Sequence, residues 1–133
     1  MENVFNKEKV KQDFDNAINK IISLVRVQQT LEQMEFIEIN LNRVRIVNYE
    51  VKHDKNNKSI YYLVLQMGSD GKILYKLINE TDEQKVIIST SEISDDYIYS
   101  INAIYAIISY FENNDNFNNI MCLIQSSMQI END

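Results

Sequence analysis

The hydrophobic pattern of the chain changes its period twice, from the helical repeat of about 3.6 residues to the strand repeat of two and back. Between Lys7 and Glu35 apolar residues recur at alternating spacings of four and three, which predicts one long amphipathic helix. Asn6 stands where an N-cap is expected. A capping box that begins at Thr30 offers the alternative of a break, and we expect the helix to continue through it. The apolar stripe consists of Val10, Phe14, Ala17, Ile21, Leu24 and Leu31.

Residues 36–90 alternate with a period of two and predict an antiparallel sheet of four or five strands. The phase of the alternation changes twice: Ile37, Ile39 and Leu41 share one phase, Val44 and Ile46 have the opposite one, and Val47, Tyr49 and Val51 return to the first. A single strand from Phe36 to His53 would exceed the usual strand length. We therefore expect a turn or bulge near Asn40–Arg43.

Three polar segments separate the later strands: Asp54–Lys58, Gly68–Gly71 and Glu80–Glu83. The second contains both glycines of the chain and is the clearest hairpin signal. Ser59–Met67, which lies between the first two, is apolar on both faces and is predicted to be a central strand. The sheet is therefore expected to be a meander.

The last third of the chain returns to helical patterning. Ser91 or Ser94 is placed to cap a helix that starts with two aspartates, a charge that suits a helix N-terminus. This helix, Asp95–Phe111, is apolar nearly all round and is predicted to lie at the centre of the core. Glu112–Asn119 is predicted to be a polar linker, and Ile120–Ile130 a short closing helix.

These elements predict one α+β domain over residues 1–133, with a long N-terminal helix, an antiparallel meander and two C-terminal helices. In layout alone the chain resembles cystatin-like folds, in which a long helix precedes a meander. Its size, acidity and mixture of sheet and helices are similar to those of small export or secretion chaperones, which implies an oligomeric holdase as an alternative function. A helix of about 28 residues is roughly 42 Å long. It should extend past so small a body, and we expect a homodimer through this first helix.

The net charge of −7 belongs entirely to the last third of the chain. Residues 1–85 hold 13 acidic and 13 basic side chains, whereas residues 86–133 hold seven acids and no Lys or Arg. Nucleic acids and anionic membrane surfaces bind basic patches on proteins, so neither is an expected partner of this acidic chain. An acidic end attracts a basic protein surface and speeds encounter with it.

Sequence signals of export and membrane insertion are missing. Charged residues interrupt the first 20 positions, which argues against a secretory signal peptide. The most apolar stretch, Tyr97–Phe111, is shorter than the roughly 20 residues that cross a bilayer. The single cysteine, Cys122, suits a reducing compartment, so we expect a cytoplasmic protein. Its apolar neighbours predict a buried, inert thiol.

Composition bears on the origin of the chain. Asn and Ile are the commonest residues, with 17 and 20 copies, and Lys exceeds Arg by ten to three. A/T-rich codons encode all three favoured residues. This bias points to a low-GC bacterium, or to one of its phages or plasmids.

The chain lacks an evident catalytic set. His53 is the only histidine, and a strand would point its sequence neighbour Asp54 to the other face. Gly68–Lys72 lacks the spacing of a phosphate loop, and the carboxylates of Glu80–Glu83 lack the pattern of a calcium loop. We expect no catalytic residue, metal or cofactor, and keep a small acid–base enzyme using His53 as an alternative.

The sequence therefore predicts a small acidic, non-enzymatic protein that acts by docking on a basic protein. An inhibitor, an antitoxin-like protein or an anti-defence protein would fit this description. Tyrosine is enriched at protein interfaces, so tyrosines beside the acids are included in the candidate site. The predicted partner-binding residues are Glu92, Asp95, Asp96, Glu112, Asp115, Tyr97 and Tyr99.

Overall fold

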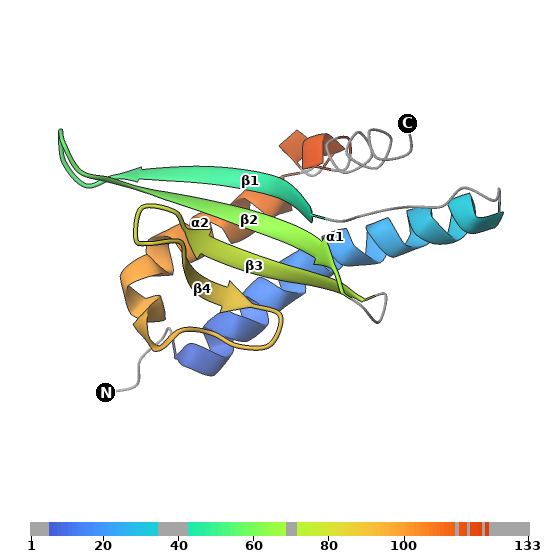
Figure 1. Cartoon of the computed structure of the whole chain (residues 1–133), viewed down its shortest axis with the longest axis horizontal. Helices are drawn as coiled ribbons and strands as arrows, with labels where there is room; N and C mark the ends of the chain where they lie inside the picture. The colour runs from blue at the N-terminus through green and yellow to red at the C-terminus, as the bar shows by residue number, and fades with distance from the viewer. Residues whose placement is uncertain are drawn as a thin grey trace.

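The chain forms a helix, a four-stranded sheet and two further helices (Figure 1). The computed structural model describes residues 6–34, 43–68, 72–113, 115–116, 118–120 and 122, with side chains of the first helix described as far as residue 24. The strands pair antiparallel in the order β1-β2-β3-β4, a meander. This confirms the predicted α+β class and settles the strand number in the described part of the chain at four. The elements are α1 (Lys7–Met34), β1 (Arg43–Lys52), β2 (Lys58–Met67), β3 (Ile73–Asn79), β4 (Lys85–Ser89), the 3-10 helix η1 (Asp95–Ser100) and α2 (Ile101–Glu112).

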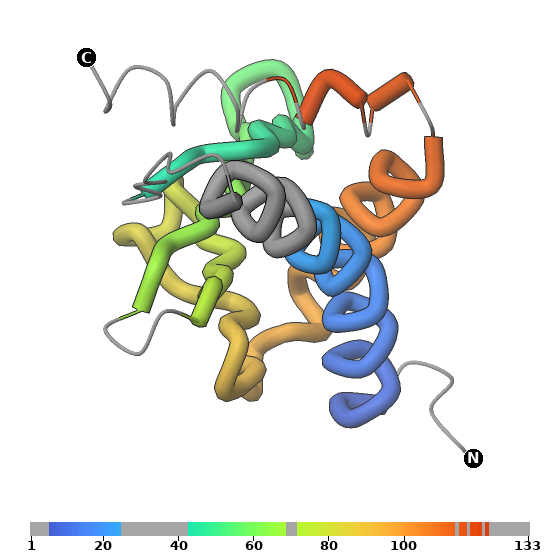
Figure 2. Tube along the Cα trace, turned by 90° about the vertical axis from the view of Figure 1, so that its right-hand side faces the viewer, coloured from blue at the N-terminus to red at the C-terminus, as the bar shows by residue number. Residues whose placement is uncertain are grey.

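Both α-helices lie on the same face of the sheet (Figure 2). α1 and α2 contact each other, and α2 also contacts β1. The core lies between this helical layer and the sheet. Its fully buried large side chains include Phe14, Ile18, Ile21, Leu63, Leu65, Leu77, Ile88, Ile104 and Ile107.

α1 begins and continues as its sequence predicts. The Asn6 side-chain oxygen accepts a hydrogen bond of 2.8 Å from the Lys9 N–H and so caps the helix. The helix runs unbroken through Thr30. Leu24 lies on the predicted apolar stripe but is exposed, because α1 runs past the sheet toward its C-terminal end (Figure 1). The side chain of Leu31 lies outside the described residues.

The bulge that the alternation implied lies inside β1. Pairing of β1 with β2 is interrupted between Arg45 and Val47, so the extra residue is Ile46. Ile46 and Val47 both face the core, which explains the reversal of phase between them. The turn or bulge expected near Asn40–Arg43 falls mainly on residues 40–42, which lie outside the described part of the chain, and Arg43 itself pairs regularly with β2.

The predicted hairpin connections and the central strand are confirmed, although residues 69–71 of the β2–β3 turn lie outside the described part. The Gly68 N–H donates a 2.7 Å hydrogen bond to the Lys72 carbonyl and closes the β2–β3 hairpin. Residues 61–65 of β2 are buried on both faces. In the β3–β4 turn, Glu83 and Gln84 adopt positive φ angles of 51° and 60°.

The C-terminal third differs from its prediction in two places. The predicted single helix is split at Ser100 into η1 and α2, and α2 buries only one face, with Ile104 and Ile107 at its centre. The predicted linker, Glu112–Asn119, is partly helical, at residues 115–116 and 118–119. Of the predicted closing helix, Ile120–Ile130, residues 120 and 122 are helical, and residues 121 and 123–130 lie outside the described part.

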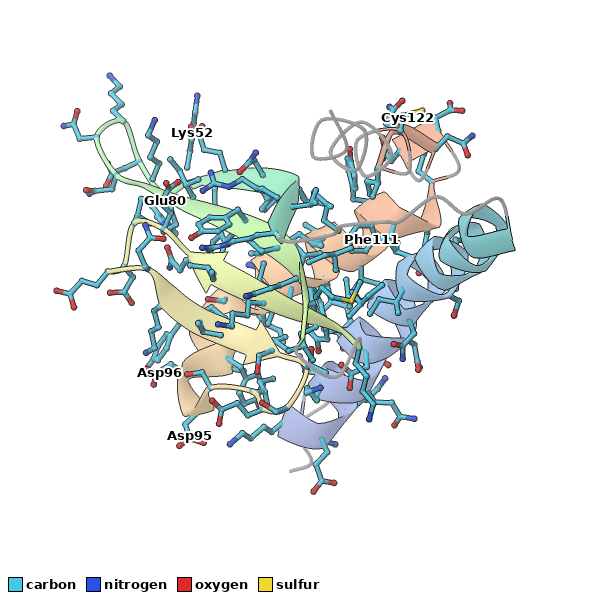
Figure 3. The ribbon with its side chains drawn as sticks, turned by 45° about the vertical axis from the view of Figure 1, so that its right-hand side comes forward. Lys52, Glu80, Asp95, Asp96, Phe111 and Cys122 are labelled. Atoms are coloured by element: carbon cyan, nitrogen blue, oxygen red, sulfur yellow. The ribbon has the colours of Figure 1, made fainter. Side chains whose placement is uncertain are left out.

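Cys122 is exposed, so the prediction of a buried thiol is wrong (Figure 3). Ile120 is fully buried in the same helical segment. Two residues along a helix correspond to about 200° of rotation, which turns Cys122 away from the core. No helix in the described residues is long and apolar enough to span a membrane.

Candidate functional site

The segment after β4 holds η1 firmly against the edge of the sheet. Ile93 forms a β-bridge with Ile88, and the Ser94 N–H donates to the Ile87 carbonyl at 2.8 Å. The Ser94 hydroxyl accepts from the Asp96 N–H at 3.1 Å and caps η1, as its sequence predicts. The side chains displayed on η1 therefore project from an anchored backbone.

Two apolar side chains of η1 point into solvent. Tyr97 is half-buried and packs against the core. The next two residues face outward, with Ile98 42% exposed and Tyr99 85% exposed. Together with three neighbouring acids they form what we call the η1 surface: Glu92, Asp95, Asp96, Ile98 and Tyr99.

Two of these acids already have cationic partners within the chain. Asp95 pairs with the Lys7 ammonium of α1, and this contact lowers the pKa of the Asp95 carboxyl. Asp96 pairs with Lys85 at the start of β4, and this hydrogen bond raises the pKa of Lys85. Both aspartates remain largely exposed and lie at the outer edge of the molecule (Figure 3). The third acid, Glu92, has no ion pair among the described residues.

The seven predicted partner-binding residues do not form one patch. Five of them, Glu92, Asp95, Asp96, Tyr97 and Tyr99, gather at η1 and the loop before it. Glu112 and Asp115 lie at the opposite end of α2, a helix of 12 residues that spans about 18 Å. The acidic third of the sequence is thus divided between the two ends of α2.

A pocket of about 450 Å³ lies between η1 and the hairpin end of the sheet. The Tyr61 and Ser100 hydroxyls, 3.1 Å apart, link the sheet to η1 at this pocket. On its outer side the His53 Nε2 and Ser59 Oγ are 2.8 Å apart. The lining residues are His53, Ser59, Tyr61, Asn79, Asp82, Lys85, Ile87, Asp96, Tyr99 and Ser100.

The sequence patterns did not predict that most of the polar residues lining this pocket lie together. Strand alternation places Tyr61 on the same face of β2 as Ser59, which stands opposite Val51. The sequence signal that could have found the contact is the register of the β1–β2 hairpin, which brings His53 beside Ser59. Ser100 could not be located this way, because its approach to Tyr61 depends on how η1 packs.

The His53–Ser59 contact has the spacing of a base and a nucleophile. Ser59 is the only side chain that hydrogen-bonds His53 within the described residues. A catalytic histidine normally has a third group that orients its ring, and Asp54 instead serves the adjacent turn. The pair alone can bind a polar group. Among the described residues there is also no group of three or more His, Cys, Asp or Glu side chains that could hold a metal ion.

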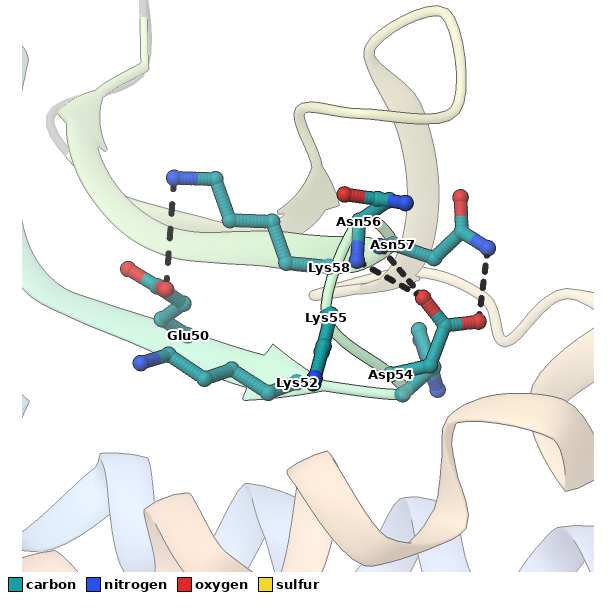
Figure 4. A pocket seen from close by; sticks show the side chains of 8 residues that line it. Glu50, Lys52, Asp54, Lys55, Asn56, Asn57 and Lys58 are labelled. Atoms are coloured by element: carbon teal, nitrogen blue, oxygen red, sulfur yellow. Dashed lines mark hydrogen bonds and ion pairs between the residues drawn. The ribbon is translucent and has the colours of Figure 1, made fainter.

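The β1–β2 hairpin forms a second hollow of about 670 Å³ (Figure 4). The Asp54 carboxylate accepts hydrogen bonds from the N–H groups of Asn56 and Asn57 and from the Asn57 amide, which lowers the pKa of Asp54. Lys58 lies 3.9 Å from Glu50 across the hairpin. These are the contacts of a stable polar turn whose side chains are exposed.

A third hollow, of about 320 Å³, lies between the two helices. The Tyr105 hydroxyl of α2 donates to the Asp13 carboxylate of α1 at 2.7 Å. This hydrogen bond lowers the pKa of Asp13, while burial and the same carboxylate raise the pKa of Tyr105 to about 12. The contact has a structural role, since it joins α1 to α2.

Comparison with protein family models, with curated proteins and with solved structures found no match. The functional argument therefore rests on the residues of this chain.

Proposed function

We propose that this chain is a small acidic, non-enzymatic protein-binding protein that docks through its η1 surface on a basic surface of another protein. The observation that carries the proposal is Tyr99, a large aromatic side chain that is 85% exposed on an anchored turn. Tyrosine is among the residues that contribute most to binding energy at interfaces, because it covers a large area at low entropic cost.

The charges around Tyr99 indicate the chemistry of the partner. Asp96 lines the same pocket as Tyr99, and Asp95 and Glu92 lie close to Tyr99 in sequence and are exposed. The exposed Tyr99 ring can also receive a cation on its face. The pairs formed with Lys7 and Lys85 are exposed, and solvent screens exposed ion pairs so that they contribute little to stability. An arginine or lysine of a partner can therefore replace them at little cost.

The biological setting belongs to the same proposal. The A/T-biased composition favours an inhibitor, antitoxin-like or anti-defence protein of a low-GC bacterium, phage or plasmid, acting in the cytoplasm. Glu112 and Asp115 would extend the acidic contact to a large partner. A homodimer through α1 is part of the proposal, supported by the exposed Leu24 and by the extension of the helix past the sheet.

Affinity capture from host cells tests the proposal. A partner of the tagged protein should be released by raised salt and lost with Tyr99→Ala. Tyr110→Ala, which removes a less exposed tyrosine on α2, is the matched control and should retain the same partner. A partner that binds both variants equally would place the interface elsewhere.

The second candidate function is a small acid–base enzyme, which the His53–Ser59 contact at the pocket favours. His53→Ala and Ser59→Ala would then abolish the same activity, whereas Tyr99→Ala would abolish partner capture alone. No comparable observation favours a holdase, because the exposed large apolar side chains of the described residues are spread over five elements.

A further inference from the structure

The helices cover one face of the sheet and leave the opposite face open (Figure 2). On that open face lie exposed residues of β1, β2 and β3. The strand register places Arg45, Val64 and Lys76 in one row across β1, β2 and β3. The next row contains Arg43, Gln66 and Leu74. We call these six residues the cationic platform.

The cations of the platform have no acidic partner in the part of the chain that the structure describes. Among the described residues Arg43, Arg45 and Lys76 form no ion pair, and the strand positions of both rows include no Asp or Glu. Arg45 and Lys76 flank β2, so their backbones are about 10 Å apart. Like charges at this spacing repel each other, and an anionic partner would relieve the repulsion.

The helical side of the molecule shows the contrast. On α1, Lys9 pairs with Asp13 and Lys11 pairs with Asp15, each four residues apart. Two lysines of α1 are thus paired with aspartates, whereas Arg43, Arg45 and Lys76 on the outer face of the sheet form no ion pair with a described residue.

The platform is ordered by packing beneath it. The Arg45 guanidinium lies 3.9 Å from the ring centroid of Tyr62, and the Tyr62 hydroxyl donates to the Gln84 side chain. Tyr62 is only 3% exposed and belongs to a small buried cluster with Val64 and Ile78. Leu74 is 39% exposed beside the cations, so an aliphatic contact is available next to the positive charge.

We infer that the cationic platform docks an acidic protein segment that carries aliphatic side chains. Carboxylates of the segment would pair with Arg43, Arg45 and Lys76, and its aliphatic groups would cover Leu74. Single-stranded nucleic acid fits less well, because the ring of Tyr62 is covered and cannot stack on bases. The platform faces away from the helical layer, so this inference is independent of the η1 surface.

A titration followed by amide NMR shifts tests the inference. The probes are a short synthetic peptide of alternating glutamate and valine, a polyglutamate peptide and an oligo-dT strand. The Glu/Val peptide should shift the amides of Leu74, Lys76 and their β1 and β2 neighbours. The Glu/Val peptide should bind the Arg45→Glu/Lys76→Glu variant about tenfold more weakly than the wild type. The variant loses two attractive surface pairs with the peptide and gains repulsion.

Two further variants control for charge and folding. Lys20→Glu/Lys55→Glu makes the same change in net charge on α1 and the hairpin tip, and should bind the peptide as the wild type does. Lys76→Ala keeps Arg45 on Tyr62 and should weaken binding by a smaller factor even if the double variant unfolds.

Three results would overturn the inference. They are peptide-induced shifts that are absent or fall elsewhere, equal weakening in both charge-reversal variants, and tighter binding of oligo-dT than of the Glu/Val peptide. Equal affinity for polyglutamate would overturn the aliphatic part of the inference.

Discussion

Burial of the Tyr105 hydroxyl and its hydrogen bond to Asp13 make stability depend on pH in the alkaline range. The pKa of Tyr105 is about 12 in the folded protein, against an ordinary value of 10.0. A raised folded-state pKa contributes stability that is complete below pH 10 and is lost as the pH rises toward 12. The wild type should therefore lose more unfolding free energy than Tyr105→Phe over this interval, as measured by urea denaturation.

At neutral pH Tyr105→Phe should cost about 1 kcal/mol, since it removes a partly exposed hydrogen bond to a carboxylate. Tyr110→Phe on the same helix is the control and should leave the pH dependence unchanged. Parallel curves for wild type and Tyr105→Phe would show that the phenol is not held protonated by Asp13.

Single residues were predictable where their structure depends on neighbours in sequence. Asn6 and Ser94 cap helices as expected, because capping involves only the next three residues. Cys122 was placed wrongly because apolar sequence neighbours do not decide which side of a helix faces the core. The pairing of Asp95 with Lys7, 88 residues apart, has no local signal at all.

At the scale of elements, the bulge in β1 predicts how two substitutions in this strand change the free energy of unfolding. Ile46 is the extra residue and is 5% exposed, whereas Asn48 faces the open side. Ile46→Ala should therefore destabilise the protein by about 2–4 kcal/mol, and Asn48→Ala by less than about 0.5 kcal/mol. Thermal and urea unfolding measure both values. A costly Asn48→Ala would contradict the bulge, because uninterrupted alternation after Val44 and Ile46 would place Asn48 in the core.

Element type followed from hydrophobic period, and element boundaries depended on tertiary contacts. The period predicted α1, the central strand β2 and the meander, because each buries a regular face. The division between η1 and α2 was not predictable, since it follows from the bridge of Ile93 to Ile88 and the packing of Tyr97. The helical residues 115–116 and 118–119 were likewise hidden by a polar sequence.

At the scale of the whole molecule, charge is segregated in space as well as in sequence. The acids of η1 lie on the helical side, and the cationic platform lies on the opposite face of the sheet. Counting residues revealed the acidic third of the chain. It could not reveal the platform, because strand register decides which cations share a face.

The most direct test of the central claim is site-specific photo-crosslinking in host cells. A photoreactive phenylalanine analogue at position 99 should form a covalent product with a partner that has a basic surface, and the same analogue at position 110 should not. Yields at position 99 should fall as salt is raised during crosslinking in lysate. A salt-insensitive product, or the same product from both positions, would contradict docking through the η1 surface.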